Sequence, residues 1–120
     1  MKLAVTSTGS DLESDLDPRF GRAAFFLCID SDSLAFDVVE NSQNLNLPQG
    51  AGIQASQTVI AQKIDALITG NCGPKAFKML QASGIEIFIG AKGRIRDVVE
   101  QYKSGELEKA GQANVEGHWV

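Results

Sequence analysis

The stretch that decides the fold covers residues 67–77 and has the sequence Leu-Ile-Thr-Gly-Asn-Cys-Gly-Pro-Lys-Ala-Phe. It is typical of a buried strand, a glycine-rich turn that holds a thiol, and the first turn of a helix. Pro74 suits the first helical position, where its missing N–H costs nothing. Gly73 is then the N-cap, and Cys72 lies just outside the helix. Unpaired N–H groups and the positive end of the helix dipole meet at this point, so the stretch predicts an anion site.

Lys75 adds a positive charge in the first turn, where the helix dipole normally favours an acid. A cation in this place predicts that a negatively charged ligand binds nearby. The alternative is that residues 70–74 form only a tight turn around a small, half-buried cysteine. The stretch by itself leaves both interpretations open.

Outside this stretch the pattern predicts one α/β domain over residues 1–120, with strands alternating with helices in the second half. Segment 23–30 is apolar on both faces, as a central strand is. Segment 34–41 alternates, which predicts a half-buried strand paired with it as a hairpin. A mixed five-stranded sheet with helices on both faces follows. The remaining strands are expected at 2–6, 66–69 and 85–89, the helices at 53–64, 74–83 and from 95 to about 104, and the tail 106–120 is expected to pack on the domain.

The composition excludes several classes of function. The chain has 120 residues and a formal net charge of −4, with no basic patch of the kind that nucleic acids or membrane surfaces require. No apolar run reaches the length of a transmembrane helix. The N-terminus enters a strand directly, so we expect a cytoplasmic protein. Cys28 and Cys72 are then free thiols, and Cys28 is expected to be buried and inert.

Five short motifs, taken in order, resemble the dinitrogenase iron–molybdenum cofactor biosynthesis family, which includes the nitrogenase accessory factors. Each motif is short, but their order and spacing are specific, and the similarity covers nearly the whole chain. The ending, residues 115–120, is most similar to the orange-protein branch of that family. The motifs are Leu3-Ala4-Val5-Thr6, Asp17-Pro18-Arg19-Phe20-Gly21-Arg22-Ala23, Gly50-Ala51-Gly52-Ile53-Gln54, Gly70-Asn71-Cys72-Gly73-Pro74-Lys75-Ala76 and Gly84-Ile85.

The resemblance implies a three-layer α/β/α fold of the ribonuclease-H-like type, with strand order 3-2-1-4-5 and strand 2 antiparallel. It also implies a non-enzymatic protein that binds a metal–sulfide cluster. In the orange-protein branch the implied cluster contains molybdenum and copper, with iron–molybdenum and iron–sulfur types as alternatives. The same branch implies MinD-like ATPases as partners.

In an open α/β sheet, ligands bind at the carboxyl ends of the strands, where the strand order reverses. With the implied order, this point lies between the strands that end near Thr6 and Thr69. We therefore expect the loops at that end to hold the cluster through positive charge, backbone N–H groups and one apolar wall. The candidate cofactor-binding residues are Arg19, Phe20, Arg22, Asn71, Cys72, Gly73, Lys75 and Lys92.

Cys72 is also a candidate metal ligand, since a thiolate suits copper or iron. Its place at the helix N-terminus is expected to lower the thiol pKa. His118, the only histidine, is a second candidate ligand if the tail folds over the site.

Structural roles compete with these assignments. For His118 the alternative is a packed or exposed tail residue. For Arg19 and Arg22 it is a salt bridge to Asp15 or Asp17 that holds their loop in shape. Asn71 suits a tight turn as well as a ligand site.

Other functions are disfavoured on specific residues. A nuclease of this fold needs clustered carboxylates starting in the first strand, and residues 2–6 contain none. A thiol redox protein needs a second cysteine near Cys72, whereas Cys28 is expected in a central strand. A protein-interaction module with no obligatory cofactor, part of an ATPase-containing complex, is the main alternative to a cluster carrier.

Overall fold

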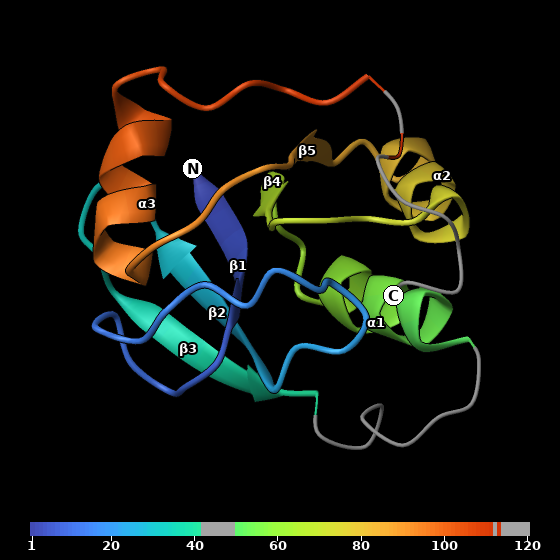
Figure 1. Cartoon of the computed structure of the whole chain (residues 1–120), viewed down its shortest axis with the longest axis horizontal. Helices are drawn as coiled ribbons and strands as arrows, with labels where there is room; N and C mark the ends of the chain where they lie inside the picture. Colours follow the sequence, from blue (N-terminus) through green and yellow to red (C-terminus); the bar gives the residue numbers. More distant parts are fainter. Residues whose placement is uncertain (42–49, 112, 114–120) are drawn as a thin grey trace.

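A computed structural model of the chain describes residues 1–41, 50–111 and 113 (Figure 1). The described elements follow the predicted order along the chain. The strands are β1 (Lys2–Ser7), β2 (Phe25–Asp30), β3 (Phe36–Glu40), β4 (Ala66–Ile68) and β5 (Glu86–Phe88), and the helices are α1 (Ala51–Ala61), α2 (Pro74–Ala82) and α3 (Ile95–Lys103).

The strands form one five-stranded sheet in the order β3-β2-β1-β4-β5. Strand β2 runs antiparallel to both β1 and β3, while β1, β4 and β5 are parallel to one another. The implied strand order and the mixed sheet are both confirmed. β1 and β4 are therefore neighbours in the sheet although about sixty residues separate them, and the chain reverses its direction of winding between them.

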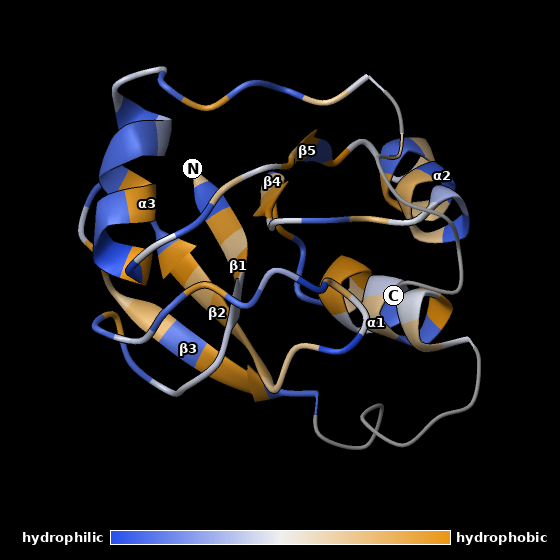
Figure 2. Cartoon of the chain, in the orientation of Figure 1, coloured by the Kyte–Doolittle hydropathy of each residue, from blue (hydrophilic) through white to orange (hydrophobic). Residues whose placement is uncertain are grey.

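Alternating side chains of the sheet contribute to two separate hydrophobic cores, one on each face. Ala4, Phe26 and Cys28 point to the face that α1 and α2 cover. Leu3 and Val5 point to the opposite face, which α3 covers together with Leu12 and Leu16 of the first loop. Figure 1 shows α3 on one side of the sheet and α1 and α2 on the other, and in Figure 2 the hydrophobic residues of α3 face the strands.

Glycines with positive φ set the helix boundaries. Helix α1 begins two residues earlier than expected, directly after Gly50, whose φ is +82°. Gly84, with φ +78°, follows the end of α2 as predicted. Helix α1 also ends three residues earlier than expected, since Lys63 turns to φ +55°. Such a φ is costly for residues with a Cβ, so it stops the helix.

The prediction that the third strand is half-buried is wrong. Phe36 and Val38 are 37% and 40% exposed, and most of β3 is open to solvent. The alternating pattern does form a strand, as predicted, but no described helix covers this part of the α3 face. Only Val39, on the opposite face, packs against a core.

The described part of the tail runs along β5. The Ala110 N–H donates to the Ile87 carbonyl at 2.7 Å, and Lys109 forms an ion pair with Glu86 at 3.1 Å. This is the packing that the sequence predicts for the tail, as far as the description extends; residues 114–120 lie outside it. Among the described helices, none is long and apolar enough to cross a membrane.

Strand β4, between β1 and β5, is short, so its three buried side chains should contribute more to stability than its length suggests. Replacing the fully buried Leu67 with alanine (Leu67→Ala) should lower the free energy of unfolding by about 2–5 kcal/mol, because it leaves a cavity between β4 and the α1/α2 layer. Val38→Ala, on the exposed strand, should cost about 1 kcal/mol or less. Urea unfolding monitored by circular dichroism measures both, and equal losses would contradict this description of the core.

Candidate functional site

The loop after β1 returns to the sheet and docks on the turn after β4. Asn71 makes the junction: its backbone N–H donates to the Pro18 carbonyl at 2.7 Å, and its side-chain amide donates to the same oxygen at 3.2 Å. The Asn71 carbonyl in turn accepts the Phe20 N–H at 3.3 Å. These bonds give Asn71 a structural role that links two loops, which is one of the two roles the sequence allowed.

The docking brings the loop and the turn into close contact at the point where the strand order reverses. A Cβ on Gly70 would lie 2.7 Å from the Pro18 Cα, so the two backbones approach closely. Behind them the buried hydroxyls of Thr6 and Thr69 bond to each other at 2.9 Å, and the Thr6 hydroxyl donates to the Asp17 carbonyl at 2.6 Å. Protein atoms therefore fill the space directly between the two loops.

Phe20 is part of this filling. It is fully buried, and its ring lies 5.7 Å from that of Phe26, centroid to centroid. The prediction that Phe20 forms the wall of an open pocket is wrong. Its side chain turns inward because the α1/α2 core offers a large aromatic ring more burial than the loop surface does.

Cys72 is also buried rather than exposed. Its side chain belongs to the α1/α2 core, and its thiol contacts the Gly73 carbonyl at 3.7 Å. Burial raises the pKa of the Cys72 thiol to about 12, because desolvation disfavours the thiolate. The predicted lowering of this pKa is wrong, since the side chain is buried in the core and desolvation dominates.

The start of α2 has the predicted geometry. Gly73 is the N-cap with extended backbone, and Pro74 occupies the first turn. No side chain caps this end, and the first turn contains no acid. The Phe77 N–H is the first to bond back, to the Gly73 carbonyl at 3.0 Å. The earlier amides of the helix therefore keep the partial positive charge that favours an anion.

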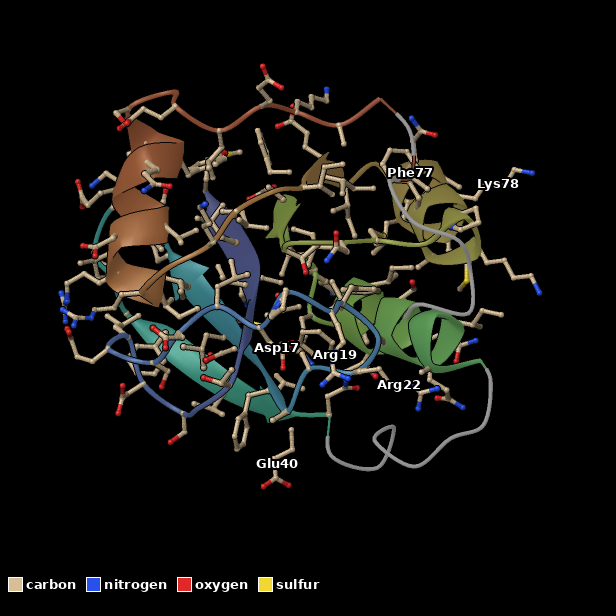
Figure 3. The ribbon with its side chains drawn as sticks, viewed as in Figure 1. Asp17, Arg19, Arg22, Glu40, Phe77 and Lys78 are labelled. Atoms are coloured by element: carbon tan, nitrogen blue, oxygen red, sulfur yellow. The ribbon has the colours of Figure 1, made fainter. Side chains whose placement is uncertain are left out.

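An open groove lies on the outer side of α2, between this helix and the described tail. We call it the α2 groove; its volume is about 310 Å³, at the lower end for small-molecule sites. Among the described residues, two lysines and an aromatic ring contribute to its lining, and no carboxylate does. In Figure 3, Phe77 and Lys78 are labelled on α2, and Lys78 extends outward. The lining residues are Pro74, Lys75, Phe77, Lys78, Gln81, Gly111 and Ala113.

The predicted cationic loops do meet at one end of the sheet. Arg19 pairs with Asn71 in an isolated β-bridge, and the loop that carries Lys92 rests on the turn after β4 through the Ala91 N–H, which donates to the Thr69 carbonyl at 3.2 Å. Lys92 is exposed. These loops form a cationic surface, whereas the open volume lies on the far side of α2.

Arg19 also has an acidic neighbour. Its Nε lies 3.9 Å from an oxygen of Asp17, and its backbone N–H donates to the same oxygen at 3.0 Å. The expectation that Arg19 holds its own loop in shape is thus confirmed for the pair with Asp17. Figure 3 shows Arg19 and Arg22 on the same loop, with Glu40 below them at the end of β3. Arg22 is half-buried.

Sequence reasoning found Lys75 but missed Lys78 and Phe77 as groove residues. The signal was available: Lys75 and Lys78 are three residues apart, so they lie on one side of a helix. Among the described residues, no three His, Cys, Asp or Glu side chains come together in a way that could hold a metal ion. His118 lies outside the described residues.

Comparisons with known proteins agree with this architecture. The family model described as dinitrogenase iron-molybdenum cofactor matches residues 1–105. The apo form of the orange protein from Desulfovibrio gigas superposes with a TM-score of 0.91 and 38% identity, over 95% of this chain and 96% of that one. A NifB-type protein of the DUF35 family from Thermotoga gives a TM-score of 0.82 and 30% identity, over 97% and 98% of the two chains. An uncharacterized protein of Methanocaldococcus jannaschii is 26% identical over 97 residues, which are 78% of this chain and 81% of that protein.

The contact between Gly70 and Pro18 generates a stability prediction. Gly70→Ala should lower the free energy of unfolding by about 1–3 kcal/mol, because the added Cβ overlaps the Pro18 backbone and must push the docked loop away. Gly111→Ala is the matched control, since a Cβ there meets nothing within 4 Å. Urea unfolding of both variants measures the difference. Equal free energies of unfolding for the two variants would contradict this prediction, because the docked loop would then move aside at no energetic cost.

The buried thiol generates a pH prediction. Below pH 9, the ordinary thiol pKa, Cys72 is protonated in the folded and the unfolded chain, so its contribution to stability is fully present. Above that value only the unfolded chain ionises, and stability falls until the folded pKa of about 12 is reached. The free energy of unfolding should decline by up to about 1.4 kcal/mol per pH unit more in the wild type than in Cys72→Ala. Parallel pH profiles of the two proteins between pH 9 and 11 would contradict the burial of this thiol.

Proposed function

This chain belongs to the dinitrogenase iron-molybdenum cofactor family, and we propose that it is a non-enzymatic carrier of an anionic metal–sulfide cluster. The likeness to the orange protein favours a cluster of molybdenum and copper, with iron–molybdenum and iron–sulfur types as the alternatives. We further propose that the protein acts in the cytoplasm and exchanges its cargo with MinD-like ATPases, the partners that the sequence resemblance implies.

The α2 groove is the observation that carries this proposal. It combines Lys75 and Lys78 with the apolar surfaces of Pro74 and Phe77, and it opens beside the uncapped start of α2. A thiomolybdate-type cluster is negatively charged and bears polarizable sulfurs on its surface. Ammonium groups and backbone amides balance its charge, and apolar side chains contact its sulfurs without competing for hydrogen bonds.

The cationic loops at the sheet end extend the positive field. Arg19 and Lys92 project from the neighbouring loops, and both side chains reach solvent. They steer an anion toward this end of the molecule, since a surface of one sign raises the local concentration of oppositely charged ligands. The short-range contacts come from the groove.

Electrostatic holding fits the chain better than a metal–thiolate bond. The Cys72 thiol is fully buried and protonated at neutral pH, so it offers no ligand without a local opening of the turn. A cluster that arrives preformed needs no protein ligand. Reversible attachment also suits a carrier, because the cargo leaves intact.

Reconstitution tests the assignment of the groove. Apo-protein is incubated with tetrathiomolybdate and copper(I), desalted, and assayed for molybdenum, copper and its visible spectrum. The double variant Lys75→Gln/Lys78→Gln should retain about tenfold less cluster, because each charge contact near the surface is worth on the order of 1 kcal/mol. The loss should shrink at high salt, where the wild type also binds less.

Matched variants separate the groove from the other candidates. Lys103→Gln, in the last turn of α3, removes one exposed lysine elsewhere and should bind as the wild type does. Arg19→Gln/Lys92→Gln tests the sheet-end loops, and a larger loss there than in the groove variant would move the site to those loops. Cys72→Ser should leave the spectrum unchanged. A lost or shifted spectrum would make the thiol a direct ligand.

The exposed β3 strand keeps the interaction module as a second candidate. Such a module would be colourless and metal-free when purified from its native host, whereas a carrier would contain molybdenum with copper or iron. Metal analysis of native material distinguishes the two.

A further inference from the structure

We infer that β3 is a docking strand, on which an extended segment of another protein, apolar on one face and basic on the other, adds as a sixth strand of the sheet. This surface is separate from the cluster site, so the inference goes beyond the proposed function. It rests on the direction of the backbone groups of β3, on its exposed side chains and on the charge of the hairpin that carries it.

The hydrogen-bond pattern fixes which backbone groups of β3 point outward. The Asn41 N–H donates to the Ala24 carbonyl at 2.9 Å, and the Asp30 N–H donates to the Ala35 carbonyl at 2.8 Å. Hydrogen-bonded pairs alternate along an antiparallel ladder. Residues 35, 37, 39 and 41 therefore bond inward to β2. The N–H and C=O groups of Phe36, Val38 and Glu40 point away from the sheet, and β3 is its last strand in the described part of the chain.

The same three residues share one face of the strand, the α3 face. Phe36 and Val38 are paired with Ile29 and Leu27, whose side chains belong to the core on that face. Within the described residues, the exposed large hydrophobic side chains are these two and Met1, whose carbonyl accepts the Ser31 N–H at the end of the same hairpin. Figure 2 shows hydrophobic residues along β3. Natural edge strands usually carry lysine or proline to prevent pairing, and β3 contains neither.

The hairpin is acidic, and Asp37 lies on the face opposite Phe36, Val38 and Glu40. Between Arg22 and Lys63 the sequence has no lysine or arginine, but it has four acids, Asp30, Asp32, Asp37 and Glu40. A hollow of about 300 Å³ opens beside the edge and is lined by Asp30, Asp37, Cys28 and Lys2, together with Ala35 and Phe36. Backbone N–H groups of Ser33 and Asp32 lower the pKa of Asp30, so this carboxylate is charged at neutral pH. Lys2 and the N-terminal ammonium lie near Asp30, so it is Asp37, the carboxylate on β3 itself, that favours a basic side chain beside the edge.

These features together define the partner. In an added strand, every second side chain lies over the α3 face, beside Phe36 and Val38, and the others lie over Asp37 and the hollow. Apolar residues suit the first set, and lysine or arginine suits the second. Main-chain bonds then supply affinity, and the alternating side chains supply specificity. A second copy of this chain fits poorly, because it brings four more acids to an already acidic hairpin.

A peptide with this pattern tests the inference. The probe is acetyl-Thr-Val-Lys-Val-Arg-Val-Thr-amide, titrated into ¹⁵N-labelled full-length protein and followed by NMR. Shifts should concentrate on β3, and the amide hydrogens of Phe36, Val38 and Glu40 should exchange more slowly with solvent when the peptide is bound. A peptide with glutamate in place of lysine and arginine, and one with alternate backbone nitrogens methylated, should each bind at least about tenfold more weakly.

One pair of variants separates backbone pairing from simple hydrophobic contact. Val38→Pro removes an outward N–H without removing a bond to β2, and proline is tolerated on edge strands. Val38→Thr keeps that N–H and has nearly the same shape. Peptide affinity should fall by about tenfold or more in Val38→Pro and stay within about threefold in Val38→Thr.

Other results would overturn the inference: no binding of the peptide, shifts centred elsewhere, equal binding of the glutamate peptide, or equal affinities of the two Val38 variants. Thermal unfolding of both variants verifies that they fold. Sedimentation of the free protein tests the second-copy alternative, and a dimer lost in Val38→Pro would assign the strand to self-association instead. Cluster uptake by Val38→Pro should equal that of the wild type, so this test can fail while the carrier function stands.

Discussion

The docking of the first loop on the turn after β4 is the contact on which the functional end of the molecule depends. One carbonyl, that of Pro18, accepts both the backbone and the side-chain N–H of Asn71, and Gly70 lets the two backbones meet. This junction lies at the point where the strand order reverses, which is where α/β proteins of this topology usually bind ligands. It also buries Phe20 and Cys72 beneath it. In the proposed function, the cluster therefore contacts the surface of α2 and the exposed loop side chains instead of Phe20 and Cys72.

The fold is predictable from the sequence because the patterns that indicate its strands and helices are local and repeated. Alternation and continuous apolar runs marked the strands, and Gly50, Gly84 and Pro74 marked helix ends at or near the positions observed. The sequence predicts the candidate site less accurately than the fold. Whether a side chain such as Cys72 points to the helix N-terminus or into the core depends on how two loops distant in sequence pack together. Neither loop alone contains that information, so the predicted direction of the Cys72 pKa shift is wrong.

Helix α2 does not need Lys75 or Lys78 for its stability. A lysine in the first turn of a helix opposes the dipole and costs up to about 1 kcal/mol. No acid in the first turn offsets it, and α2 gains its stability from Ala76, Phe77 and Leu80, which pack against the sheet. Phe36 and Val38 are a second exception of the same kind, since their exposure adds no stability. Where a residue departs from a local structural preference and no other contact offsets the cost, a functional role is expected.

These two exceptions lie on surfaces of opposite charge. The α2 groove carries Lys75 and Lys78 and the sheet-end loops carry Arg19 and Lys92, whereas the β2–β3 hairpin has acids and no lysine or arginine. On these two proposals, an anionic cluster is repelled by the hairpin and attracted to the groove, and a basic peptide responds in the opposite way. The charge distribution thus keeps the two ligands from competing for one surface. A protein with a net charge of only −4 can in this way present strong fields of both signs. A carrier that must bind its cargo and a partner at the same time needs such a separation, because its partner would otherwise displace the cargo that it is meant to receive.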